Sequence, residues 1–175
     1  MASKPTELDK QLLASIEDID PAVSRVTEEQ QGRLKEVYFK GGGATRTAVL
    51  KKVSQLKTST ARELILAGLG DQAADVRLEA VKASVGWNDP EMKQKRLATL
   101  NEATNGMELS RLTQAMGAET HEEPVLKLMV SILSGPRPVD LKSQAIAVLQ
   151  QAHYEPAIPL IESFIKLSMS GMAGS

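Results

Sequence analysis

The sequence has no cysteine and very few aromatic residues. The missing cysteines exclude disulfide scaffolds, cysteine nucleophiles and thiolate metal sites. His121 and His153 are the only histidines, and they are far apart in the sequence, so we expect no metal site. Aromatic residues make up 3% of the chain, which argues against a β-sandwich or a β-barrel because those folds favour aromatic and β-branched side chains. The core must therefore be aliphatic, as in packed helices.

Long apolar runs are also missing. None approaches the roughly 20 residues that a membrane-spanning helix needs, and the polar start MASKPTELDK is not a signal peptide. We therefore expect a cytoplasmic protein that does not associate with membranes. A serine nucleophile would need a strand-borne elbow, and the sequence offers no such element. We predict no catalytic residues, no cofactor and no enzymatic activity.

What the chain does contain is a series of short amphipathic helical patterns. Apolar residues recur at helical spacing from Leu8 to Ile165, and no segment shows the alternation of a strand. The connections have two to five residues, which makes neighbouring helices antiparallel pairs. Two segments, 60–63 and 120–123, have the pattern of a capping box, and Asp89 before Pro90 is a further helix-start signal. The sequence therefore predicts an all-α fold.

Composition divides the chain into four segments. They are an acidic N-terminal helical arm (1–40), a glycine hinge (41–44), a helical repeat domain (45–167) and a disordered tail (168–175). The three consecutive glycines of the hinge maximise backbone freedom. They do not indicate a nucleotide site, because the lysine spacing of a Walker loop and a preceding strand are both missing.

The charges are unevenly distributed, although the net charge is only −1. Residues 1–32 carry three basic and seven acidic side chains, whereas residues 33–62 carry eight basic side chains and one acidic one. Such asymmetry is typical of a partner surface. It equally fits an acidic arm that folds back onto the basic segment, and the sequence does not separate these two alternatives.

An internal repeat runs through the second half of the chain. The segment 69–86 aligns with 133–152, so that Val76 corresponds to Leu141 and Ala80 to Ala145, at an offset of 65 residues. Half of this offset, about 32 residues, is within the range of stacked helical repeats.

The residues of this repeat resemble those of a known family of helical repeats. Leu69-Gly70-Asp71, followed by Asp75-Val76-Arg77, Ala80 and Ala83, resembles a HEAT repeat of the armadillo/HEAT class. The resemblance covers about 59–167 and is best over 69–86 and 133–165. It implies a short right-handed α-solenoid of antiparallel helix pairs. In HEAT repeats an Asp caps the second helix, and the Arg after an apolar residue helps to join neighbouring repeats. The motif says little about function.

A solenoid presents an extended surface for partners. We therefore predict a protein–protein interaction module, an adaptor or scaffold that binds an acidic or apolar partner segment. The candidate partner-binding residues are Arg46, Lys51, Lys52, Lys57, Arg62 and Trp87. The alternative is nucleic-acid binding through the basic segment 46–62. Trp87 either seals two repeats in the core or lies on the surface as a binding hot spot.

The arm is the remaining open question. Its stripe of leucine and isoleucine between Leu8 and Ile19 is too apolar to stay in water, yet a helix of this length is marginal alone. It must dock, either as a cap on its own solenoid or on another chain, which would make a homo-oligomer.

Overall fold

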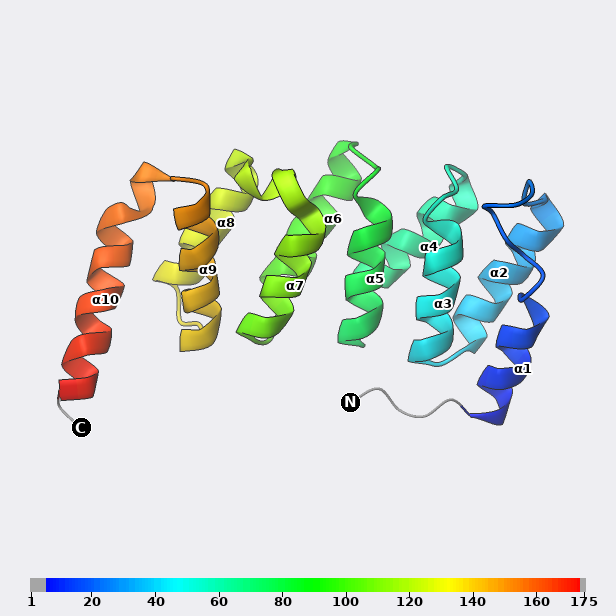
Figure 1. Ribbon diagram of the computed structural model, residues 1–175, viewed down its shortest axis with the longest axis horizontal. Helices are drawn as coiled ribbons and strands as arrows, with labels where there is room; N and C mark the ends of the chain where they lie inside the picture. Colours follow the sequence, from blue (N-terminus) through cyan, green and yellow to red (C-terminus); the bar gives the residue numbers. More distant parts are fainter. Residues whose placement is uncertain (1–5, 174–175) are drawn as a thin grey trace. The chain divides into compact units, whose positions relative to one another are not determined.

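The computed structural model describes residues 6–173, and over this range the chain is helical without any strand (Figure 1). The all-α prediction is confirmed. The helices are α1 (Glu7–Ser15), α2 (Glu28–Lys40), α3 (Gly43–Val53), α4 (Ser59–Leu69), α5 (Ala74–Ser84), α6 (Pro90–Asn101), α7 (Gly106–Met116), the 3-10 helix η1 (Gly117–His121), α8 (Glu123–Ser134), α9 (Val139–Gln151), the 3-10 helix η2 (Glu155–Ala157) and α10 (Ile158–Ala173).

The chain forms two compact units that divide within α6, between Thr99 and Leu100. In the first unit α3 and α5 lie side by side, with α2 and α4 behind them in the view of Figure 1. Its core is largely aliphatic, because each of these helices turns a stripe of Leu, Ile, Val or Ala inward, and Tyr38 of α2 is buried with them. Ala80 of α5 is fully buried, and its small side chain lets α4 approach closely at Gly68.

The second unit repeats part of this arrangement. Helices α7 and α9 lie side by side, α8 packs against α9, and α10 packs against α8 (Figure 1). Leu141 and Ala145 of α9 are buried, as are Val76 and Ala80 at the corresponding positions of α5. The internal repeat therefore places the same kind of residue in each core.

The capping residues predicted for two helices are wrong, although both helices form. The box predicted at 60–63 is displaced, because α4 begins at Ser59 and the hydroxyl of Thr58 accepts the Ala61 N–H. The box predicted at 120–123 does not form, because Thr120 lies in η1 and its hydroxyl donates to the Gly117 carbonyl. The cap at Asp89 is confirmed by its bond from the Met92 N–H.

The segments predicted as hinge and tail are both more structured than expected. Gly43 and Ala44 are the first residues of α3, and the Gly42 N–H donates to Asp9 Oδ1 at 2.7 Å. A Cβ atom at Gly41 would collide with Thr45, so a side chain there does not fit this tight turn. In place of a disordered tail from residue 168, α10 continues to Ala173, and residues 174–175 lie outside the described range.

Candidate partner-binding surfaces

The acidic arm contacts the basic segment of its own chain through Asp9. This carboxylate accepts hydrogen bonds from the Gly42 N–H and the Thr45 hydroxyl, each at 2.7 Å, and from the N–H and hydroxyl of Thr6. The bond from Gly42, followed by those from Thr45 and Thr6, holds the pKa of Asp9 well below its usual range. A single charged side chain thus joins the start of α1 to the start of α3.

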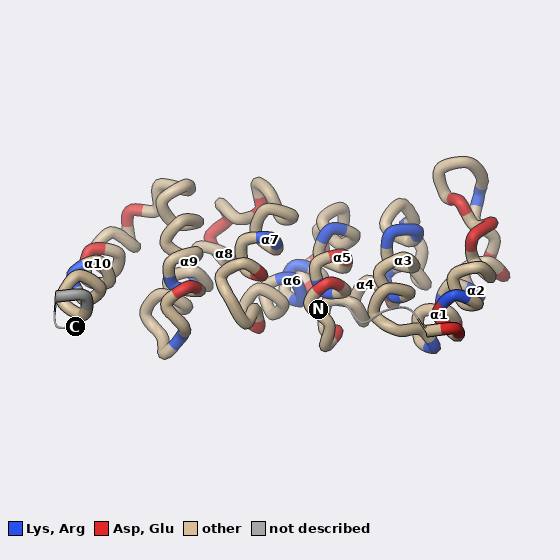
Figure 2. Tube along the Cα trace, turned by 60° about the horizontal axis from the view of Figure 1, so that its bottom comes forward, with Lys and Arg blue, Asp and Glu red and all other residues tan. Residues whose placement is uncertain are grey.

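Two basic side chains of segment 33–62 also contact the acidic residues 1–32 or their backbone. Lys52 Nζ donates to the Ile19 carbonyl at 2.7 Å, and Arg33 lies 3.4 Å from the Asp18 carboxylate. These contacts support the alternative in which the acidic arm folds back onto segment 33–62. Figure 2 shows basic and acidic positions interspersed over the first unit.

The two arginines of the candidate site are held by carboxylates of the same chain. Arg46 makes two bonds to Asp71, at 2.8 and 3.1 Å, and also donates to the Gly41 carbonyl. Arg62 makes two bonds of 2.7 Å to Asp89 and one of 2.9 Å to Glu91. The Arg62 guanidinium lowers the pKa of Asp89 to about 2, and the two carboxylates raise the pKa of Arg62.

Trp87 is brought together with two of the predicted cations. Lys57 Nζ lies 4.9 Å from the ring centroid and the Arg62 guanidinium carbon 5.4 Å from it, both within cation–π range. The side chain is half-buried, and its indole N–H is enclosed without a hydrogen-bond partner in the described part of the chain. The indole is therefore in contact with two basic side chains, and it is neither wholly core nor a free surface anchor.

The six predicted residues do not form one basic surface. Only Lys57, Arg62 and Trp87 meet, whereas Arg46 and Lys52 each bind elsewhere in the first unit. Lys51 is exposed and makes no side-chain hydrogen bond or ion pair to residues 6–173.

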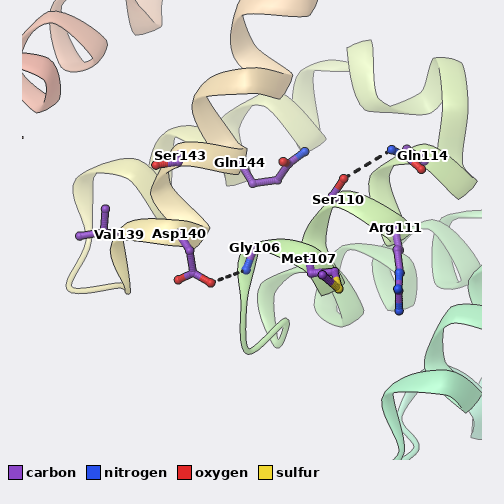
Figure 3. A pocket seen from close by; sticks show the side chains of 9 residues that line it. All are labelled: Gly106, Met107, Ser110, Arg111, Gln114, Val139, Asp140, Ser143 and Gln144. Atoms are coloured by element: carbon purple, nitrogen blue, oxygen red, sulfur yellow. Dashed lines mark hydrogen bonds between the residues drawn. The ribbon is translucent and has the colours of Figure 1, made fainter. Parts of the chain in front are cut away.

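A groove between α7 and α9 was not predicted (Figure 3). It has a volume of about 920 Å³ and is lined by Gly106, Met107, Ser110, Arg111, Gln114, Val139, Asp140, Ser143 and Gln144. Asp140 Oδ2 accepts the Gly106 N–H at 2.7 Å and ties the two helices together. Met107 and Val139 are 65% and 66% exposed, so both leave apolar surface in contact with water.

The side chains of this groove retain hydrogen-bonding capacity. Arg111, Ser143 and Gln144 make no hydrogen bond or ion pair through their side chains within residues 6–173. The Ser110 hydroxyl accepts only a long bond of 3.4 Å from the Gln114 side-chain amide. A hydroxyl and an amide can each donate and accept, which suits the alternating N–H and C=O groups of a peptide backbone.

An equivalent groove of about 870 Å³ lies between α3 and α5 in the first unit. Its lining residues on α5 correspond to those on α9 at the 65-residue offset, so that Asp75 matches Asp140 and Glu79 matches Gln144. The chemistry differs, because Asp75 and Glu79 make no ion pair with described residues, whereas the second groove has the unpaired Arg111. The repeat offset is the sequence signal that relates the two grooves to each other, although it does not give their location.

No protein-family model, curated protein or solved structure matches this chain. Its function is therefore inferred from its own residues. Within residues 6–173 there is no group of three or more histidine or acidic side chains that could hold a metal ion. No described helix is both long and apolar enough to span a membrane. His121 and His153 are both exposed, in η1 and in the turn after α9.

Proposed function

We propose that the chain is a short right-handed HEAT-like α-solenoid of antiparallel helix pairs, and that it is a non-enzymatic protein–protein interaction module. The two equivalent grooves, one between α3 and α5 and one between α7 and α9, support a repeat architecture because they recur at the same register. The observation that carries the function is the α7/α9 groove, in which unpaired polar groups lie between exposed apolar side chains.

The α7/α9 groove suits an extended partner segment with one acidic side chain. Ser143 and Gln144 would bind the backbone of this segment, and Arg111 would pair with its carboxylate. Met107 and Val139 would pack against its apolar side chains. The α3/α5 groove, with Asp75 and Glu79, would prefer a basic side chain instead.

The binding chemistry then lies in the two grooves and not in the basic segment 46–62. Arg46 and Arg62 already bind carboxylates, so their charges are not available to steer an acidic partner without breaking those pairs. The same pairs weaken the alternative of nucleic-acid binding through segment 46–62, because phosphates would compete with Asp71 and Asp89. Phosphate binding would fall steeply with rising salt, which distinguishes the two functions.

A library of short random peptides displayed on phage, panned against the intact chain, tests the proposal. We expect selected peptides to share an acidic residue flanked by apolar ones. Calorimetry with a selected peptide should show at least a tenfold weaker Kd, about 1.4 kcal/mol, for Arg111→Glu. Arg25→Glu is the matched control, because Arg25 is an exposed arginine outside both grooves. Equal binding by the two variants, or no enriched peptide family, would refute the assignment.

A further inference from the structure

The apolar stripe of helix α10 is only partly covered by its own unit. Ile161 is buried, and α10 packs against α8. Ile158 lies three residues before Ile161, and Ile165 and Met169 lie four and eight residues after it, so all are close together around the helix, yet these three are 50%, 47% and 65% exposed. Their spacings of seven and four residues place these three side chains in one stripe along the helix. An apolar stripe with this spacing is typical of a helix that packs against another helix.

Two opposite charges lie next to the stripe. Glu162 and Lys166 are exposed and make no ion pair, either with each other or with other described residues. They are four residues apart, one turn of the helix. An unpaired acidic and an unpaired basic side chain beside an apolar stripe make this face complementary to a copy of itself in the antiparallel orientation.

The register of such a pair follows from symmetry. In two antiparallel helices related by a two-fold axis, residues at equal distances on either side of the axis face each other. The midpoint of Glu162 and Lys166 is residue 164, and the midpoint of Ile158 and Met169 is about half a residue from it. Ile165, one residue from this point, would meet its own copy close to the axis. One register therefore satisfies both the charge pairs and the apolar contacts.

A groove of about 500 Å³ adjoins the stripe, between α9 and α10. Leu149, Ile158 and Ile161 contribute apolar side chains to its lining. In the register above, Met169 of the second copy comes opposite Ile158, at the edge of this groove. A flexible thioether side chain is well suited to filling an irregular space of this kind.

We propose that the exposed face of α10 is a homodimer interface, in which α10 of a second copy packs antiparallel against it about an axis near residue 164. Glu162 of each copy pairs with Lys166 of the other, and the Ile158, Ile165 and Met169 side chains form the apolar centre. The interface is isologous, so it closes at two copies and does not propagate.

The charge pairs allow a test that depends on the register. Sedimentation equilibrium of the intact chain over a concentration series should show a dimer. Glu162→Lys and Lys166→Glu should each weaken it about tenfold, because both pairs of the symmetric interface become repulsive. An equimolar mixture of the two variants should recover the dimer, since every charge then faces an opposite one. Lys127→Glu, an exposed lysine on α8, should leave dimerisation unchanged.

Three results would overturn the proposal. They are a wild-type chain that stays monomeric at all accessible concentrations, charge variants that dimerise as well as the wild type, and a mixture that does not recover the dimer. Ile165→Glu provides a second test that does not depend on the charges, and it should make the chain monomeric. Its circular dichroism melting curve should match that of a monomeric charge variant, because the Ile165 side chain is 47% exposed in the single chain.

Discussion

At the scale of single residues, polar side chains in the first unit bond to backbone groups at or near the ends of other helices. Asp9 accepts from the Gly42 N–H at the start of α3, and Lys52 donates to the Ile19 carbonyl after α1. Helix ends leave backbone groups without intrahelical partners. A side chain from another element that reaches such a group fixes the two elements relative to each other.

The Asp9 contacts predict a stability that depends on pH. The folded-state pKa of Asp9 lies well below the unfolded value near 3.9, so the carboxylate stabilises the fold above that value and loses this contribution as the pH falls below it. Asp9→Asn should lower the free energy of unfolding at pH 7, and the difference from wild type should shrink below about pH 4. Urea denaturation at a series of pH values measures this difference. A difference that is constant with pH would contradict the role of the charge.

Arg96 illustrates what sequence patterns do not reveal at this scale. It is fully buried, and its guanidinium donates at 2.6 Å to the carbonyl of Ser84, the last residue of α5, and at 2.9 Å to the Trp87 carbonyl. An arginine on an amphipathic helix is expected to be solvated. Here the carbonyl groups at the end of α5 provide acceptors for it. Such an environment depends on contacts between elements, which helical periodicity does not encode.

We expect Arg96→Met to destabilise the first unit by about 3 kcal/mol, because it removes the charged hydrogen bonds that a fully buried side chain makes to the Ser84 and Trp87 carbonyls. Arg111→Met is the matched control, since Arg111 is exposed and forms no ion pair with the described residues, and it should change stability by less than about 0.5 kcal/mol. Chemical denaturation followed by circular dichroism compares the two. Similar losses in both variants would show that the buried contacts of Arg96 contribute little.

At the scale of elements, the helices could be predicted from the sequence but their ends only in part. Apolar periodicity identified the stripes, and Gly and Pro marked the breaks. The N-cap of α4 was misassigned because Thr58 and Thr60 are chemically equivalent as caps, and the backbone path before the helix selects Thr58. The continuation of α10 was missed because residues 168–173 are Ser, Met, Gly and Ala, a composition that is not typical of a helix. The grooves required knowledge of which helices are neighbours in space.

Gly68 and Gly32 give opposite predictions for the same substitution. A Cβ atom on Gly68 of α4 would lie 2.8 Å from the Ala80 Cβ and 3.0 Å from Leu50, whereas one on Gly32 of α2 would meet nothing within 4 Å. Gly68→Ala should therefore separate α4 and α5 and cost about 1–3 kcal/mol. Gly32→Ala should stabilise the chain by about 0.5–1 kcal/mol, because alanine favours the helix.

Thermal unfolding of the two glycine variants provides the measurement. A stabilising Gly68→Ala would mean that α4 and α5 are not in close contact at Ala80. Ala80→Leu tests the same contact from the other helix, and it should also be destabilising because Ala80 is fully buried.

At the scale of the whole molecule, the arm belongs to the first unit. The sequence suggested a boundary at the glycines, since composition changes there. The compact units divide instead at Thr99, inside a helix, where no glycine or proline marks the sequence. Ile16, Ile19 and Val26 of the arm are buried, and Asp9 is bonded to α3 of the same chain. Contacts between distant residues decide this division, which is why local composition did not predict it.

Deletion of residues 1–26 tests the place of the arm and keeps Thr27 as the N-cap of α2. Loss of three buried apolar side chains and of the Asp9 bonds should destabilise the first unit. Trp87 is the only tryptophan and lies in that unit, so its fluorescence reports there alone, whereas circular dichroism reports both units. The fluorescence midpoint should therefore fall below the circular dichroism midpoint in the truncated chain.

Adding a synthetic peptide of residues 1–26 should return the fluorescence midpoint toward that of the intact chain, in proportion to the peptide bound. The same peptide with Asp9→Asn is the matched control, and it should be less effective because it lacks the carboxylate that accepts from Gly42 and Thr45. If the truncated chain melts like the intact one by both probes, the arm does not stabilise the first unit. It would then be a segment available to an external partner.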